Sequence, residues 1–177
     1  MTYRILGAFA ALLAFLTLPA TADESLQTSE PAGKVILTVT GAIEDGTAAD
    51  GMSAAEFDLA MLKSLPATEF ETTTIWTEGV QRFRGVALAD LLEHLDAATG
   101  TIRATALNDY GVEIPTKDAV DGGPIIAYMR NGDEMSVREK GPLWIIYPYD
   151  SRALYRSERY YSRSIWQLRR LTIVADR

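Results

Sequence analysis

The side chains best suited to bind a ligand lie in one stretch, from Asn108 to Pro148. Its first turn, Asn108-Asp109-Tyr110-Gly111, offers a carboxylate and a phenol. Its last part is a short apolar run that follows Gly141-Pro142 and carries Trp144 and Tyr147. A run bounded in this way is typical of a buried strand, which would hold both rings rigidly near one end. Aromatic faces and a carboxylate favour non-covalent binding, and the residues alone leave the ligand open.

The residue types that are missing narrow the chemistry further. The 177-residue chain has no cysteine and one histidine, His94, which is expected on a helix surface. Thiol catalysis, disulfides and cysteine-ligated metals are therefore excluded, and a histidine metal site or a Ser-His-Asp triad is not expected. A carboxylate-based hydrolase is an alternative that needs neither residue, although no motif places a pair of acidic side chains.

The first residues are predicted to direct export. Arg4 supplies a positive charge, residues 5–18 are apolar, and Ala20-Thr21-Ala22 fits a small-x-small cleavage site. The apolar segment is too short to favour a transmembrane helix, so an uncleaved anchor is only the alternative. We therefore expect a signal peptide at 1–22, a flexible leader at 23–33 and a single domain at 34–177 that resides in the periplasm and is not inserted in the membrane.

The formal charge of the chain is −7, yet its last part is basic. Residues 151–170 hold six arginines against one acidic residue. Such a chain is not expected to bind nucleic acid, but the basic segment could bind an anion or an acidic partner protein. A solvated helix surface is the alternative. The residues assigned to a partner surface are Arg152, Tyr155, Arg156 and Arg159.

Most of the predicted elements are strands. They cover residues 34–41, 70–76, 102–107 and 165–174, the apolar run around Trp144, and a hairpin turning at Asn131-Gly132. Two helices are predicted, at residues 53–65, where Ser53 and Glu56 form a capping box, and around the leucines at 88–95. Residues 42–51 and 77–85 are predicted loops. The fold class is therefore α+β, with a mostly β core and peripheral helices.

Five short motifs follow one another along this pattern. They are FRGVALADLL at 83–92, ALNDYGVEIP at 106–115, IIAYMRNG at 125–132, GPL at 141–143 and WQL at 166–168. In this order they resemble the oxidoreductase molybdopterin-binding domain, the sulfite-oxidase fold, over roughly residues 36–174. The resemblance implies a β core of that type and a pterin site.

The chain differs from the enzymes of that family in lacking their metal ligand. Those enzymes hold molybdenum through a cysteine in the loop before the first motif, whereas residues 76–84 contain no thiolate. The chain is similar to exported members without cysteine, which bind a free reduced pterin of the tetrahydropterin type. The resemblance thus implies no molybdenum, no enzyme activity, and signalling to the periplasmic domain of a membrane-bound cyclic-di-GMP enzyme or sensor. The alternative is a degenerate fold that serves only as a protein-interaction module.

A pterin suits the candidate side chains. Its flat bicycle needs an aromatic platform, and its aminopyrimidinone edge needs an acceptor for two N–H groups. Trp144 could instead fill the core, as Trp166 is expected to do, and Asp109 could merely stabilise its turn. We expect Trp144, Tyr110 and Asp109 to share one cavity. The full predicted ligand set is Trp76, Asn108, Asp109, Tyr110, Trp144, Tyr147 and Arg163.

Overall fold

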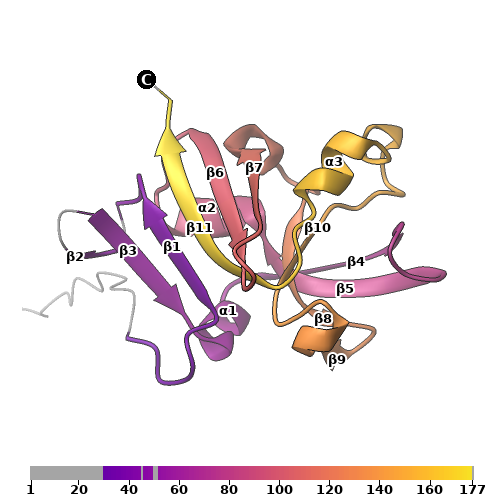
Figure 1. The fold of residues 1–177 in the computed structure, drawn as a ribbon, viewed down its shortest axis with the longest axis horizontal. Coiled ribbons are helices and arrows are strands. Elements are labelled where there is room, and N and C mark those ends of the chain that lie inside the picture. Colours follow the sequence, from indigo (N-terminus) through magenta and orange to yellow (C-terminus); the bar gives the residue numbers. More distant parts are fainter. Residues whose placement is uncertain (1–29, 45, 50–51, 177) are drawn as a thin grey trace, which may run out of the picture.

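The structure is a computed structural model that describes residues 30–44, 46–49 and 52–176. The predicted signal peptide at 1–22 and most of the leader at 23–33 lie outside the described residues. Two sheets form the framework of the described chain, and short helices lie around them (Figure 1). The domain is therefore α+β and dominated by sheet, as the sequence predicts.

The larger sheet has six strands in the order β2-β3-β1-β11-β6-β7. β1 and β11 pair in parallel, so segments from the two ends of the described chain lie side by side, and the other pairs are antiparallel (Figure 1). The strands are β1 (Leu37–Gly41), β2 (Thr47–Ala49), β3 (Met52–Phe57), β6 (Gly100–Ala106), β7 (Gly111–Pro115) and β11 (Leu168–Ala175).

The second sheet has the order β10-β8-β5-β4, and the short β9 pairs with β8. Its strands are β4 (Ala67–Thr73), β5 (Val80–Ala87), β8 (Ile125–Arg130), β9 (Asp133–Glu134) and β10 (Trp144–Ile146). The helices are α1 (Leu59–Ser64), α2 (Leu88–His94) and α3 (Glu158–Arg163), with 3-10 turns η1 (Thr116–Asp118), η2 (Val137–Glu139) and η3 (Ala153–Tyr155). Of these, α3 packs beside β7 (Figure 1).

The leucine spacing that predicts α2 is confirmed. Leu88, Leu91, Leu92 and Leu95 are all buried in the common core, because positions three and four apart lie on one face of a helix. His94, which was expected on a helix surface, is the last residue of α2 and is half-buried.

The predicted capping box is wrong. Ser53 and Glu56 lie in β3, which pairs with β1, and the helix begins only after Asp58. The alternation around Glu56, with Ala55 and Phe57 buried, is the period of a strand and outweighs a local capping motif. β2, for its part, lies inside the predicted loop at 42–51.

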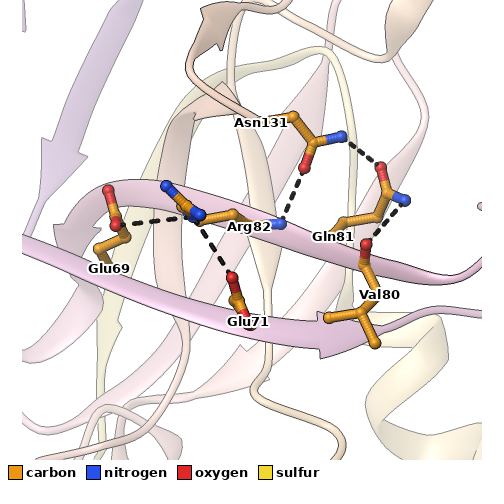
Figure 2. Close-up of polar contacts among 6 residues, drawn as sticks. All are labelled: Glu69, Glu71, Val80, Gln81, Arg82 and Asn131. Atoms are coloured by element: carbon orange, nitrogen blue, oxygen red, sulfur yellow. Dashed lines mark hydrogen bonds and ion pairs between the residues drawn. The ribbon is translucent and has the colours of Figure 1, made fainter.

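The predicted loop at 77–85 is also wrong, because β5 begins at Val80. Arg82 and Arg84 of this strand face solvent. Arg82 pairs across to β4, with its Nε 3.4 Å from Glu71 Oε1 and 4.0 Å from Glu69 Oε1 (Figure 2). Opposite charges facing each other across two strands stabilise their pairing modestly, even when exposed. Arg82 and Arg84, which suggested a loop, therefore lie on the solvent-facing side of β5.

The hairpin predicted at Asn131-Gly132 is confirmed, and Asn131 also holds its neighbour strand. Its side-chain oxygen accepts the Arg82 backbone N–H at 2.9 Å, and its amide donates to Gln81 Oε1 at 2.9 Å (Figure 2). Asn131 adopts a φ of 54°, a conformation that asparagine tolerates. The turn thus fixes the register between β8 and β5.

Asp58 should make the folding stability of the protein depend on pH in the acidic range. Its carboxylate accepts the backbone N–H groups of Met61 at 2.8 Å and Gly33 at 2.7 Å, and these bonds, Met61 first, lower its pKa from the ordinary value of 3.8. The pKa of Asp58 is lower in the folded state than in the unfolded state. The stabilisation is therefore fully present when the pH is above the unfolded-state pKa, and it is lost as the pH falls through the folded-state pKa.

We therefore expect Asp58→Ala to melt a few degrees lower than wild type at neutral pH, through loss of the helix N-cap. The difference should shrink as the pH falls below 3.8, which thermal unfolding followed by circular dichroism at several pH values would measure. A difference that stays constant down to strongly acidic pH would contradict this role. Exposed Asp133→Ala is the matched control.

Candidate ligand-binding site

A cavity of about 690 Å³ lies where four segments meet. The segments are the loop after β4, the β6–β7 turn, α3, and the residues that connect α3 to β11. This volume is in the range that small-molecule ligands occupy. The lining residues are Ile75, Trp76, Ala106, Asn108, Tyr110, Glu158, Tyr161, Ser162, Ser164, Ile165 and Trp166.

Trp76 is the centre of the aromatic part of this cavity. Its ring meets those of Trp166 and Tyr161 edge to face, with centroids 5.7 and 5.8 Å apart. Its ring also meets that of the buried Trp144 edge to face, at 5.8 Å. Edge-to-face pairs contribute roughly 0.5–1.5 kcal/mol each beyond area burial. The three tryptophans of the chain therefore form one cluster, two of whose members line the cavity.

Lys140 approaches this cluster from the segment before β10. Its ammonium lies 4.5 Å from the ring centroid of Trp166 and 5.7 Å from that of Trp144. A cation at this range is attracted to an indole face. Trp166, which is 36% exposed, is thus held by packing and by a cation while part of its surface stays open.

The polar groups at the cavity come from two sides. Asn108 uses its side-chain oxygen to accept the Tyr110 backbone N–H at 3.2 Å, which leaves its amide N–H groups for a ligand. Glu158 is exposed in the first turn of α3, and in the described chain it forms no ion pair. Ser164 is occupied, because its hydroxyl bonds to Tyr149 and to the Tyr160 carbonyl. Asn108 and Glu158 are therefore the polar groups best placed to orient a ligand.

Three of the seven predicted ligand residues line the cavity, namely Trp76, Asn108 and Tyr110. The expectation that Trp144, Tyr110 and Asp109 share one cavity is not met. Trp144 is 0% exposed, and its indole N–H donates to the Ser164 carbonyl at 3.2 Å, so it packs in the core behind Trp76.

Asp109 turns away from the cavity. It adopts a φ of 64° in the β6–β7 turn, and its exposed carboxylate accepts a hydrogen bond from Arg169 Nη2. A short polar side chain tolerates this left-handed conformation, which is the turn role that the sequence left open.

Tyr147 and Arg163 belong to a separate polar network centred on Asp118. Arg163 Nη1 lies 2.7 Å from Asp118 Oδ2, and the Tyr147 hydroxyl donates to the same oxygen at 2.9 Å. Burial, followed by the charge of Asp118, raises the pKa of Tyr147, so its hydroxyl stays a proton donor. Because Arg163 ends α3 and Asp118 ends η1, this network fixes the helix that forms one wall of the cavity.

The predicted partner surface is only partly exposed. Tyr155 is 4% exposed and packs on Tyr147 and Tyr160, so it is a core residue. Arg152 and Arg159 are exposed, and Arg156 is also exposed with its guanidinium 3.9 Å from Asp150. Three of the four predicted residues can therefore meet a partner.

Sequence reasoning missed eight of the eleven cavity residues. The three of them with an acidic or aromatic side chain are Glu158, Tyr161 and Trp166. The first two lie in a segment that reads as a charged surface, and Trp166 was expected in the core. Trp166 precedes β11 and forms only an isolated bridge to Trp144, which is why its ring escapes full burial. Its position in the last motif was the one available signal.

Comparison with known proteins adds no family: no family model matches the chain, and no curated protein matches it. Within the part of the chain that the structure describes, no three His, Cys, Asp or Glu residues are grouped to hold a metal ion. In the same residues, no helix is both long and apolar enough to cross a membrane. The described residues thus form an α+β protein with an aromatic-lined cavity.

Proposed function

We propose that this chain is a periplasmic protein of the sulfite-oxidase-fold type that binds a reduced pterin, without metal or catalysis of its own. The observation that supports it best is the cavity itself, in which the rings of Trp76, Tyr161 and Trp166 border the same space as Asn108 and Glu158. The ordered motifs of the sequence support the fold type, and the absence of any cysteine supports a metal-free site.

The proposed chemistry divides the ligand between two kinds of contact. The flat bicycle stacks on the open part of Trp166, and its exocyclic amine and ring N–H donate to the Glu158 carboxylate. Asn108 donates to the pterin carbonyl. A carboxylate that accepts two N–H groups gives orientation as well as affinity. Glu158 thereby takes the role that the sequence assigned to Asp109.

The proposed signal passes through α3. This helix places Glu158 and Tyr161 at the cavity and Arg159 on the exposed surface. A ligand that contacts α3 favours one position of the helix and so changes how the neighbouring arginines meet a partner. The proposed partner is the periplasmic domain of a membrane-bound cyclic-di-GMP enzyme or sensor.

A protein-interaction module without a ligand is the second candidate. It is favoured by Leu154, which is 60% exposed between Arg152 and Arg156. Arginine is enriched at protein interfaces, and an exposed apolar side chain between two exposed arginines of the sequence suits such a surface. Under this reading the cavity is incidental to the partner surface.

Calorimetric titration of the purified protein with tetrahydrobiopterin, without oxygen, tests the first proposal. We expect saturable binding to wild type and affinity lower by about tenfold in Trp166→Ala, the loss of one good stacking contact. The exposed Val80→Ala, on β5 away from the cavity, should bind like wild type.

Absence of saturable binding to wild type would end the pterin proposal. Equal pterin affinity in wild type and Trp166→Ala would show that the pterin does not bind in this cavity. If a partner domain is captured equally with and without the pterin, and equally by Trp166→Ala, the interaction module is the better description.

A further inference from the structure

We propose a second ligand site, for a small organic anion with an apolar body, which also borders the β6–β7 turn. A cavity of about 440 Å³ lies there and shares no lining residue with the first. Its lining residues are Lys34, Val35, Ile36, Thr38, Leu107, Met135, Ser136, Val137, Pro142, Arg169 and Arg170.

The charge of this cavity contrasts with that of the protein. Three cations, Lys34, Arg169 and Arg170, line it and no acidic residue does, although the chain as a whole carries −7. Among the described residues, Lys34 and Arg170 form no ion pair, and the one partner of Arg169 is Asp109, outside the lining. Uncompensated cations around a concave surface attract an anion.

The backbone brings two consecutive arginines to this one cavity. In a regular strand, neighbouring side chains point to opposite faces of the sheet. Here the register between β11 and β6 shifts between Leu168 and Arg170, which is a β-bulge at Arg169, and Gln167 just before it has a φ of 53°. Bulges re-aim side chains and are common beside functional sites. The bulge explains why Arg169 and Arg170 both border the cavity.

Arg169 also carries an N–H that lacks an acceptor. Its Nε is buried and has no hydrogen-bond partner within the described residues, while its Nη2 bonds to Asp109. Buried polar groups in folded proteins are nearly always paired, and a guanidinium binds an oxyanion through adjacent N–H groups. A carboxylate or phosphate oxygen in the cavity would supply the acceptor.

The remaining lining is mostly apolar, so a bare inorganic ion would use only part of the site. Leu107 and Val137 are both exposed beside the cavity, and Met135 lies buried against it. Apolar walls with a few convergent polar groups are typical of sites for small molecules. The shared chemistry is an oxyanion joined to a short apolar chain.

Octanoate is the probe, followed by amide shifts in nuclear magnetic resonance spectra of the purified protein. We expect saturable shifts at Leu107, Met135 and Val137, and affinity weaker by about tenfold or more in the double variant Lys34→Ala/Arg170→Ala. Both substituted residues are exposed, so the variant should fold. Arg103→Ala, an exposed arginine of the same sheet, should leave the octanoate affinity unchanged.

Two further probes decide what is recognised. Inorganic phosphate should bind more weakly than octanoate at the same residues, and 1-octanol should not saturate them. Equal binding of 1-octanol, equal affinity in the double variant, or shifts confined to the Trp76 cavity would each overturn the proposal. Because the two cavities share no residue, failure here leaves the pterin titration unaffected, and the reverse also holds.

Discussion

Trp144→Ala should lower the free energy of unfolding by about 3–5 kcal/mol, the range for large aromatic side chains removed from a core. The side chain is fully buried, its ring meets that of Phe83 edge to face at 5.5 Å, and its indole N–H donates to the Ser164 carbonyl. Removing it leaves both a cavity and an unpaired carbonyl. Urea denaturation followed by circular dichroism measures the loss.

Trp166→Ala is the matched control, since it removes the same side chain from a partly exposed position in the same cluster. We expect a loss in stability well below half that of Trp144→Ala, together with the larger loss in pterin affinity. If Trp144→Ala were as stable as wild type, or if it abolished binding while remaining fully folded, Trp144 would be a ligand contact and its assignment to the core would fail.

Asp118→Ala should be the second largest change, with about 3 kcal/mol lost, at the lower end of the range for breaking a buried ion pair. The Asp118 and Arg163 side chains are 6% and 18% exposed, so removal of the carboxylate leaves a mostly buried guanidinium and the Tyr147 hydroxyl without their shared acceptor. Because Arg163 ends α3, we also expect weaker pterin binding. Chemical denaturation and the calorimetric titration measure the two effects.

A double-mutant cycle separates the pair from its surroundings. Arg163→Ala in the Asp118→Ala background should cost much less than in wild type, because the cation no longer loses a partner. The exposed pair of Arg103 and Glu113 is the control, with an expected coupling energy of about 0.2–1 kcal/mol. Additive losses at Asp118 and Arg163 would contradict the network and its role in holding α3.

Local pattern predicted much of the fold. The leucine period of α2 and the Asn-Gly turn between β8 and β9 depend on neighbours in sequence, and both were correct. The helix start predicted at Ser53 was wrong, because this segment pairs as β3 with β1. That pairing is a contact with another part of the chain, which a local capping motif does not reveal. The loop predicted around Arg82 was wrong for a similar reason. The carboxylates that pair with Arg82 lie on β4, and the local sequence of glycines and arginines does not show this pairing.

Cavity residues that are neighbours in sequence could be predicted, whereas residues that packing brings to the cavity could not. Asn108 and Tyr110 share a turn, so one motif located both. Glu158 and Trp166 reach the same cavity only because α3 packs beside β7 and is held there by the Asp118 network. Trp144 and Tyr147 were predicted as ligand contacts from their chemistry. Trp144 lies in β10 and Tyr147 follows that strand directly, and both side chains are fully buried, which depends on the whole fold.

The most direct test is a crystal structure of the protein grown with tetrahydrobiopterin in the absence of oxygen. We expect density for one flat bicycle against the exposed face of Trp166, with its N–H edge within hydrogen-bonding distance of Glu158 and its carbonyl near Asn108. Density for the ring at any other place, or a cavity without it at a concentration that saturates the calorimetric titration, would contradict the account.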